Sequence, residues 1–282
     1  MSRMISYMEK DTAIHRLSGF TKLLFFMIWC ITGALTYDTR VLAVMLVMGA
    51  VIYLISKTEW KQVSAVFKAV IIFMILNLIF IFIFSPYEGC RIYGSTTPLR
   101  IGIGSIILTK EQLFYELNVM MKYFTVIPAV FIFLTTTDPS EFAASLNMVG
   151  VPYTFAYSVA IALRYIPDVQ DDFTRIKNAQ EARGIEMSGK AGFTDRIKRV
   201  ASIIFPLLFS TMERIDVVSN AMELRGFGKK KKRTWYSFRA LSLCDKCVIA
   251  FIVLFFAAAM AFTFYDGNRF WYCGTGSCPR NR

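Results

Sequence analysis

The sequence predicts an all-α polytopic membrane protein, with about five transmembrane helices and a cytoplasmic or interfacial module of amphipathic helices. Of its 282 residues, 55% are hydrophobic and 26 are Phe, and the mean hydropathy is +0.48. These values are far from those of an ordinary soluble domain. The apolar residues also gather in windows of about 20, the length that crosses a bilayer as a helix.

Five windows are long and apolar enough to span the membrane. Four are clear, and the fifth, Val119 to Thr137, contains Lys122 and Pro128; a proline can kink a membrane helix without excluding a span. The clear windows are Phe20 to Tyr37, Val41 to Ser56, Val63 to Phe84 and Cys247 to Tyr265. The N-terminal segment is polar and lacks the apolar core and cleavage site of a signal peptide. We therefore expect the first window to remain in the mature protein.

Composition divides the chain into three regions. Residues 1–137 form an N-terminal membrane region with four spans, residues 138–239 form the amphipathic module, and residues 240–282 form the final span and a tail. The segment between Phe84 and Val119 is rich in Gly, Ser, Thr and Pro, which indicates a loop with room for a small hairpin. In residues 138–239, Lys and Arg recur up to the run "KKKKR" at Lys229 to Arg233.

The formal net charge of +12 reports orientation in a membrane protein, because basic loops stay on the cytoplasmic side. This rule places the basic module and the N-terminus in the cytoplasm and leaves the tail outside. Nucleic acid is accordingly not expected as a partner, whereas the basic run can also meet anionic lipid of the membrane.

The six cysteines predict no metal site. Cys244 and Cys247 form a Cys-x-x-Cys pair, but a structural zinc site needs four ligands and the single histidine, His15, is remote. We interpret the pair as small apolar residues. Cys273 and Cys278 in "CGTGSC" would lie on the oxidising side, where they either form a disulfide or stay free.

The stretch "EARGIEMSGKA" contains an incomplete phosphate-binding loop. Gly184 to Lys190 fits the Walker A spacing, but the next residue is Ala191, which has no hydroxyl for Mg²⁺. A P-loop also follows a buried strand, whereas the residues before Gly184 read as an amphipathic helix. We therefore expect no nucleotide site and no cofactor here.

Two amphipathic helices are predicted within the module. Apolar residues recur in steps of three or four over Pro152 to Ala182, which is a helical stripe. From about Asp195 to Leu224 the mean spacing is near 3.5, which favours packing along a seam.

Both helices end in Glu-(Ala or Leu)-Arg-Gly, 42 residues apart. These ends are Ala182, Arg183 and Gly184 in the first helix and Leu224, Arg225 and Gly226 in the second. Glycine past a helix end takes the left-handed conformation that closes the last turn, and arginine suits the negative end of the helix dipole. Either copy alone reads as a good helix cap. Two copies favour a contact in which each guanidinium meets a carboxylate on another protein.

These segments carry a family resemblance. The region "LTTTDPSEFAASLNMVGVPYTFAYSVAIALRYIPDVQDDFTRIKNAQEARG", then "IFPLLFSTMERIDVVSNAMELRGFG", and near the N-terminus "IHRLSGFTKLL" resemble the T component of energy-coupling factor transporters, the scaffold family that includes CbiQ. The resemblance covers most of Ile14 to Gly228 and is weakest at Ser85 to Gln112 and after Phe238.

The resemblance implies a non-catalytic scaffold in the cell membrane of a prokaryote. Such a scaffold joins two ABC-type ATPase subunits, which hydrolyse ATP, to a membrane substrate-binding S component that captures a vitamin or metal ion. By resemblance, the Arg-Gly end at Ala182, Arg183 and Gly184 contacts one ATPase, and that at Leu224, Arg225 and Gly226 contacts the other. Leu224 stands where the family usually has Ala.

Two other functions remain as alternatives. The carboxylates of Asp168, Asp171 and Asp172 in "DVQDD" are spaced as in Mg²⁺-dependent membrane prenyltransferases, but a second aspartate-rich motif is not apparent. A self-sufficient channel or carrier would need ionisable residues within its spans. The five spans offer only Lys68, Asn77 and Lys122, with both lysines near span ends, which favours spans built for packing and lipid contact.

Overall fold

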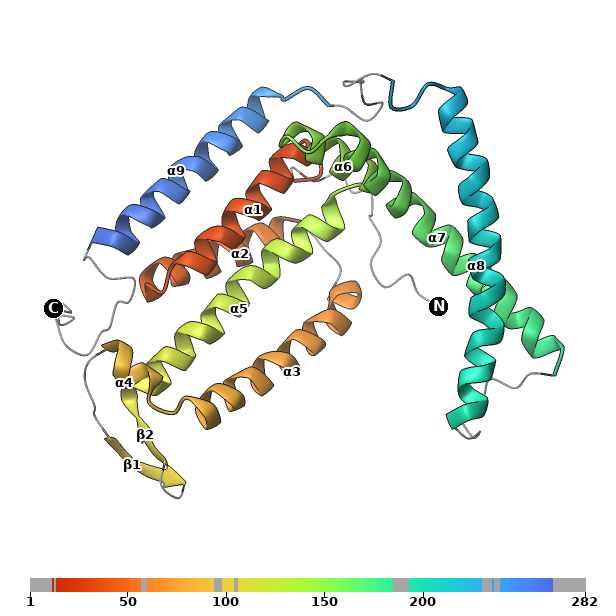
Figure 1. The fold of residues 1–282 in the computed structure, drawn as a ribbon. Helices are drawn as coiled ribbons and strands as arrows, with labels where there is room; N and C mark the ends of the chain where they lie inside the picture. Colours follow the sequence, from red (N-terminus) through yellow and green to blue (C-terminus); the bar gives the residue numbers. More distant parts are fainter. Residues whose placement is uncertain are drawn as a thin grey trace. The chain divides into compact units, whose positions relative to one another are not determined.

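The computed structural model describes residues 12, 14–56, 60–93, 98–103, 106–184, 193–229, 235 and 239–265. The chain divides into two compact units. Unit 1 combines Met1–Asp138 with Arg239–Arg282, and unit 2 is Pro139–Phe238. The final apolar helix thus belongs to the same unit as the N-terminal membrane region (Figure 1).

Helices account for most of both units, which confirms the predicted all-α class. Unit 1 contains α1 (Gly19–Leu35), α2 (Thr39–Ser56), α3 (Trp60–Phe84), α4 (Glu88–Tyr93), α5 (Lys110–Thr136) and α9 (Leu243–Tyr265). Unit 2 contains α6 (Pro139–Met148), α7 (Tyr153–Ala182) and α8 (Phe193–Leu224). The strands β1 (Pro98–Ile103) and β2 (Ile106–Thr109) pair antiparallel in the loop where the sequence leaves room for a hairpin.

The predicted spans are continuous helices. Four helices, α2, α3, α5 and α9, are long and apolar enough to cross a membrane. The fifth, α1, has 17 residues, at the lower end of the roughly 17 to 25 that suffice. Pro128 lies inside α5, and the helix continues beyond it to Thr136.

Helix α5 is the packing centre of unit 1, and α1, α2, α3 and α4 all contact it (Figure 1). Trp29 of α1 is buried against α5, and its indole Nε1 donates to the carbonyl oxygen of Thr125 at 3.0 Å. Gly49 of α2 lies where an added Cβ would meet Trp29 at 3.5 Å and Pro128 at 3.6 Å. The small residue therefore lets α2 approach both partners closely.

A polar junction of buried side chains joins three helix ends. It consists of Ser18, Thr21 and Lys22 at the start of α1, Thr136 at the end of α5 and Asp245 at the start of α9. Asp245, 2% exposed, accepts from Ser18 N at 2.9 Å and from Thr21 Oγ1 at 3.0 Å. Lys22 Nζ donates to the carbonyl oxygen of Thr136 at 2.7 Å. A buried carboxylate and ammonium are retained because each is fully engaged by such partners.

The polar junction shows which ends of the helices in unit 1 lie together. The start of α1 meets the start of α9 through Asp245, and the far ends of the same two helices meet through Thr36 and Thr263, whose hydroxyl oxygens are 2.8 Å apart. The two helices therefore run parallel. The start of α1, the end of α5 and the start of α9 consequently lie together at one end of unit 1.

The opposite end of unit 1 carries α4 and the hairpin. Gly89 N donates to Gln112 Oε1 at 2.9 Å, and Asn118 bridges Thr39 and Tyr93 at 2.7 and 3.2 Å. An added Cβ at Gly89 would come within 2.4 Å of the Glu111 carbonyl oxygen. Glycine is required there because α4 sits directly on the α5 backbone.

Candidate functional site

The two long helices of unit 2 form an antiparallel pair. The start of α7 meets the end of α8 through Tyr157 and Phe227, whose ring centroids are 4.9 Å apart. The end of α7 meets the early part of α8, where Gln180 Nε2 donates to the carbonyl oxygen of Ser202 at 3.1 Å. The helices cross in Figure 1. The predicted ranges Pro152 to Ala182 and Asp195 to Leu224 agree with α7 and α8 within two residues.

The first tip, defined as Ala182, Arg183 and Gly184, closes α7. Gly184 has φ of +84°, and its N–H donates to the carbonyl oxygen of Glu181 at 3.0 Å. Arg183 caps the helix, with its N–H on the Ala179 carbonyl oxygen at 3.2 Å. All three tip residues are exposed. The predicted left-handed glycine at this helix end is confirmed.

The second tip, defined as Leu224, Arg225 and Gly226, closes α8 in the same way. Gly226 has φ of +68° and donates to the Glu223 carbonyl oxygen at 2.9 Å. The next amide, of Phe227, donates to the Met222 carbonyl oxygen at 2.9 Å, which completes a Schellman motif. Leu224 is 89% exposed, so an apolar side chain stands beside the exposed Arg225.

The end of α6, also in unit 2, is closed by a glycine that no arginine precedes. At the end of α6, Gly150 has φ of +110°, and Val151 N donates to the Leu146 carbonyl oxygen at 3.1 Å. The residue that precedes Gly150 is Val149. The closure of a helix by glycine is therefore general in this unit, and the exposed arginine distinguishes the two tips from it.

The two tips lie at opposite ends of the antiparallel pair, because each closes its own helix. With 30 residues in α7 and a rise of about 1.5 Å per residue, they are separated by roughly 45 Å. The two exposed arginines therefore stand far apart, at separate ends of the helix pair.

The aspartates of "DVQDD" are engaged by an arginine on the facing helix. Arg214 Nη2 donates to Asp172 Oδ2 at 2.7 Å, and Arg214 Nη1 lies 3.9 Å from Asp168 Oδ2. Asp171 is exposed. Within the described ranges, no group of three His, Cys, Asp or Glu side chains could hold a metal ion. This arrangement is that of an ion-paired helix contact rather than of a diphosphate site, which needs several free carboxylates around Mg²⁺.

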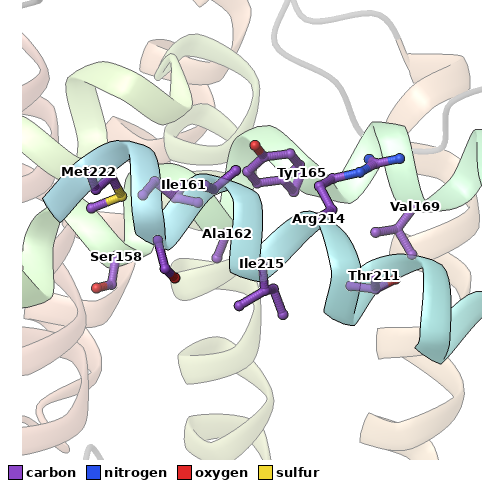
Figure 2. Close-up of a pocket in the computed structure, with 11 residues that line it drawn as sticks. Ser158, Ile161, Ala162, Tyr165, Val169, Thr211, Arg214, Ile215 and Met222 are labelled. Atoms are coloured by element: carbon purple, nitrogen blue, oxygen red, sulfur yellow. The ribbon is translucent and has the colours of Figure 1, made fainter. Parts of the chain in front are cut away.

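A groove of about 390 Å³ runs between α7 and α8 beside this ion pair (Figure 2). Its lining is mostly apolar, including Ile161, Val169 and Ile215, and Arg214 is the charged residue among the described ones that line it. The guanidinium of Arg214 lies 5.9 Å from the centre of the Tyr165 ring. Sequence reasoning did not single out Arg214. The sequence did contain a sign of its role. Arg214 is a basic residue on the otherwise apolar stripe of α8, and α7 carries one aspartate cluster that could pair with it.

Of the few polar residues that the predicted spans offer to a carrier, Lys122 takes part in packing between helices. Lys122 Nζ donates to the Ala34 carbonyl oxygen at 3.1 Å and lies 3.1 Å from the centre of the Tyr37 ring. Lys68 is exposed on α3 and Asn77 is half-buried on the same helix. Lys122 thus closes the end of α1 rather than lining a path.

Several predicted features lie outside the described residues. These are the Gly-Lys of the incomplete Walker A pattern, the basic run beyond Lys229, and the pair Cys273 and Cys278. Cys244 and Cys247 are described: both are free and exposed at the start of α9.

Comparison with known proteins gives a consistent result. The family described as Cobalt transport protein, CbiQ, matches residues 10–236. The chain is 29% identical over 212 residues to the Energy-coupling factor transporter transmembrane protein EcfT of Leuconostoc gelidum subsp. gasicomitatum, covering 71% of this chain and 74% of that protein.

Two further EcfT proteins are similar over longer stretches. That of Streptococcus equi subsp. equi is 26% identical over 256 residues, covering 88% of this chain and 91% of the relative. That of Limosilactobacillus fermentum is 28% identical over 270 residues, covering 90% and 96%.

Proposed function

The chain belongs to the CbiQ family, the T components of energy-coupling factor transporters, and on that premise we propose that it is the scaffold linking two ABC-type ATPase subunits to a membrane substrate-binding S component. The transported solute would be a vitamin or a metal ion, captured by the S component. The scaffold itself would be non-catalytic, with ATP hydrolysis in its partners.

The pair of arginine tips is the observation that carries this proposal. Each tip carries an exposed arginine at a helix end that the following glycine, with positive φ, closes. Arginine makes two parallel charge-assisted hydrogen bonds to a carboxylate, which is a strong and directional contact. We therefore assign the first tip to one ATPase and the second tip to the other, each against an acidic groove.

The antiparallel arrangement of α7 and α8 supports the use of two ATPases. Opposite ends of a stiff helix pair can bind two separate subunits and move with both of them. The ion pair between Arg214 and Asp172 holds the helices together between these ends. Motion of the ATPases would then reach the membrane region through a single connected element.

Contact with the S component and the bilayer is supported by the apolar surface of both units. On α8, Phe205, Phe209 and Met212 are 59%, 65% and 60% exposed, in steps of three or four that place them on one face. Exposed apolar patches of this kind mark protein or membrane contacts. The module would lie on the cytoplasmic side with the N-terminus, in the plasma membrane of a prokaryote.

Co-purification with the ATPases tests the proposal. The chain is co-expressed with its ATPase subunits, and the ATPase recovered with it is measured for wild type, for Arg183→Glu with Arg225→Glu, and for Arg175→Glu. Arg175 is also exposed on α7 but lies two turns before the tip, so it is a matched charge reversal. We expect the double variant to lose ATPase association and uptake, with expression and membrane insertion intact. Normal assembly and uptake in the double variant would refute the proposal.

A further inference from the structure

Phe227 and Trp235, which follow the second tip in the sequence, form an aromatic cluster with Tyr153 and Tyr157 of α7. The Phe227 ring centroid lies 5.9 Å from that of Tyr153 and 4.9 Å from that of Tyr157. Trp235 lies 5.2 Å from Tyr153 and 6.1 Å from Tyr157. All four separations fall within the range of about 4.5 to 7 Å at which ring pairs attract.

Trp235 also ties this cluster to the connection between α6 and α7. Its indole Nε1 donates to Asn147 Oδ1 at 3.2 Å. Asn147 Nδ2 donates in turn to the Val151 carbonyl oxygen at 2.9 Å, just before α7 begins. Trp235 thus contacts both the first turns of α7 and the end of α6.

Phe227 couples the cluster directly to the cap of α8. The amide of Phe227 completes the Schellman motif on Met222, while its ring packs between the two tyrosines of α7. Because Gly226 has no side chain to restrict its backbone, the direction in which the chain leaves α8 depends on where the Phe227 ring is held. The hydrogen bond from Phe227 N to the Met222 carbonyl oxygen closes the turn that contains Leu224 and Arg225.

We propose that the aromatic cluster is the positioning element of the second tip, with Phe227 as the residue that transmits its placement to Arg225. The cluster and the first tip lie at opposite ends of the helix pair. The end with the first tip is the one at which Gln180 contacts Ser202. A change in the cluster should therefore disturb the second tip and leave the first tip unaltered. The effect of the cluster on ATPase docking rests on the proposed function. The positioning of the second tip by the cluster does not.

Spin-label mobility in the full chain tests the positioning without any partner. A single cysteine replaces Glu223 beside the second tip, or Glu181 beside the first, in a background without native cysteines, and the labelled chain is placed in lipid nanodiscs. Electron paramagnetic resonance spectra are compared for Phe227→Ala and for Phe173→Ala, an exposed phenylalanine of α7 (43% exposed) outside the cluster. Trp235→Phe serves as a mild variant that keeps a ring and loses the donor to Asn147.

We expect Phe227→Ala to increase the mobile fraction of the label at 223 and to leave that at 181 unchanged. Trp235→Phe should give a smaller shift at 223, and Phe173→Ala should alter neither label. The inference is overturned if Phe227→Ala leaves the label at 223 immobile. It is equally overturned if both labels loosen together, because the ring would then only support unit 2 as a whole.

Capture of the ATPases supplies the second measurement. With the first tip disabled by Arg183→Glu, Phe227→Ala should weaken the remaining association by about tenfold, the scale expected when a ring packed on aromatic neighbours is lost. If the labels respond as expected and association does not change, positioning holds and the assignment of the second tip to an ATPase fails. The two proposals are thereby separated.

Discussion

Arg214 of α8 donates to Asp172 of α7 at 2.7 Å, between the contacts that join the helices at either end. The same guanidinium approaches Asp168 and faces the Tyr165 ring. The Arg214 guanidinium, which contacts two carboxylates and a ring of α7, favours one angle between the two crossing helices. This contact accordingly contributes, with those at either end, to how the two tips are placed relative to each other.

Loss of this ion pair should loosen the crossing more than it destabilises the chain. The side chains of Arg214 and Asp172 are 36% and 22% exposed, and ion pairs open to solvent contribute about 0 to 1 kcal/mol. We expect Arg214→Ala or Asp172→Asn to lower the apparent melting temperature slightly and to reduce ATPase association clearly. Thermal unfolding in detergent and co-purification measure the two effects.

The charge-reversed pair, Arg214→Asp with Asp172→Arg, is the internal control and should recover part of the association lost in either single variant. Asp171→Asn, at the exposed neighbouring position, should have no effect. Equal losses in the single variants and in the reversed pair would show that charge complementarity at the crossing is not what matters.

Local patterns predicted the helices well, because membrane helices must satisfy their backbone hydrogen bonds within one segment. The left-handed glycines at 184 and 226 were equally predictable, since a helix cap depends on a few adjacent residues. Long-range partners were not. Lys22 reads in the sequence as one more basic residue of a cytoplasmic flank, yet it is 5% exposed and bonded to the end of α5.

The same limit applies to the candidate site. The "DVQDD" spacing resembles a metal-binding motif, and only the antiparallel register, which brings Arg214 opposite Asp172, shows the carboxylates in an ion pair. Likewise, Phe227 and Trp235 stand in a basic segment whose composition gives no reason to expect packing. Their packing depends on the antiparallel course of α8, which brings the residues after its end to the first two turns of α7.

Substitution of the tip glycines should impair docking through backbone conformation alone. An added Cβ at Gly184 would meet nothing within 4 Å, so space is not the obstacle there. The left-handed conformation costs most residues about 1 to 2 kcal/mol, and Asn tolerates it better. We expect Gly184→Val or Gly226→Val to weaken ATPase association more than the matching →Asn change, measured by co-purification. Identical behaviour of the Val and Asn variants would contradict the role of the cap.

Gly150→Val is the matched control for these variants. It places the same strain at a cap without arginine, at the end of α6. We expect Gly150→Val to lower the yield of folded chain. The amount of ATPase that co-purifies with each folded chain should change less.

Leu224 should contribute to docking at the second tip by inserting into an apolar pocket of its partner. It is 89% exposed, and burial of a leucine side chain stabilises a contact by about 1.5 to 3 kcal/mol. Leu224→Ala should therefore weaken association at this tip by about tenfold or more, with the melting temperature of the isolated chain unchanged. Ala182→Leu, the reciprocal change at the first tip, tests whether that contact can accept the larger side chain. Full affinity of the Leu224→Ala variant would show that the leucine stays in solvent.

The two ends of unit 1 should react from opposite sides of the membrane. Cys244 and Cys247 are exposed at the start of α9, beside the polar junction, whereas Tyr87 is 48% exposed next to α4 at the other end. With the basic module in the cytoplasm, a membrane-impermeant thiol reagent applied to intact cells should label Tyr87→Cys in a background without native cysteines. It should not label a chain that retains only Cys244 and Cys247 until the cells are opened.

The tail adds a redox test to the same experiment. Cys273 and Cys278 would lie outside with Tyr87, where a disulfide between them can persist; their labelling should then require a reductant. Labelling of the tail that does not depend on reductant would remove the disulfide but keep the orientation. Reagent that reaches Cys244 or Cys247 in intact cells, but never position 87, would invert the orientation and place unit 2 outside. Labelling of both ends from one side would contradict the placement of α4 and of the start of α9 at opposite ends of unit 1.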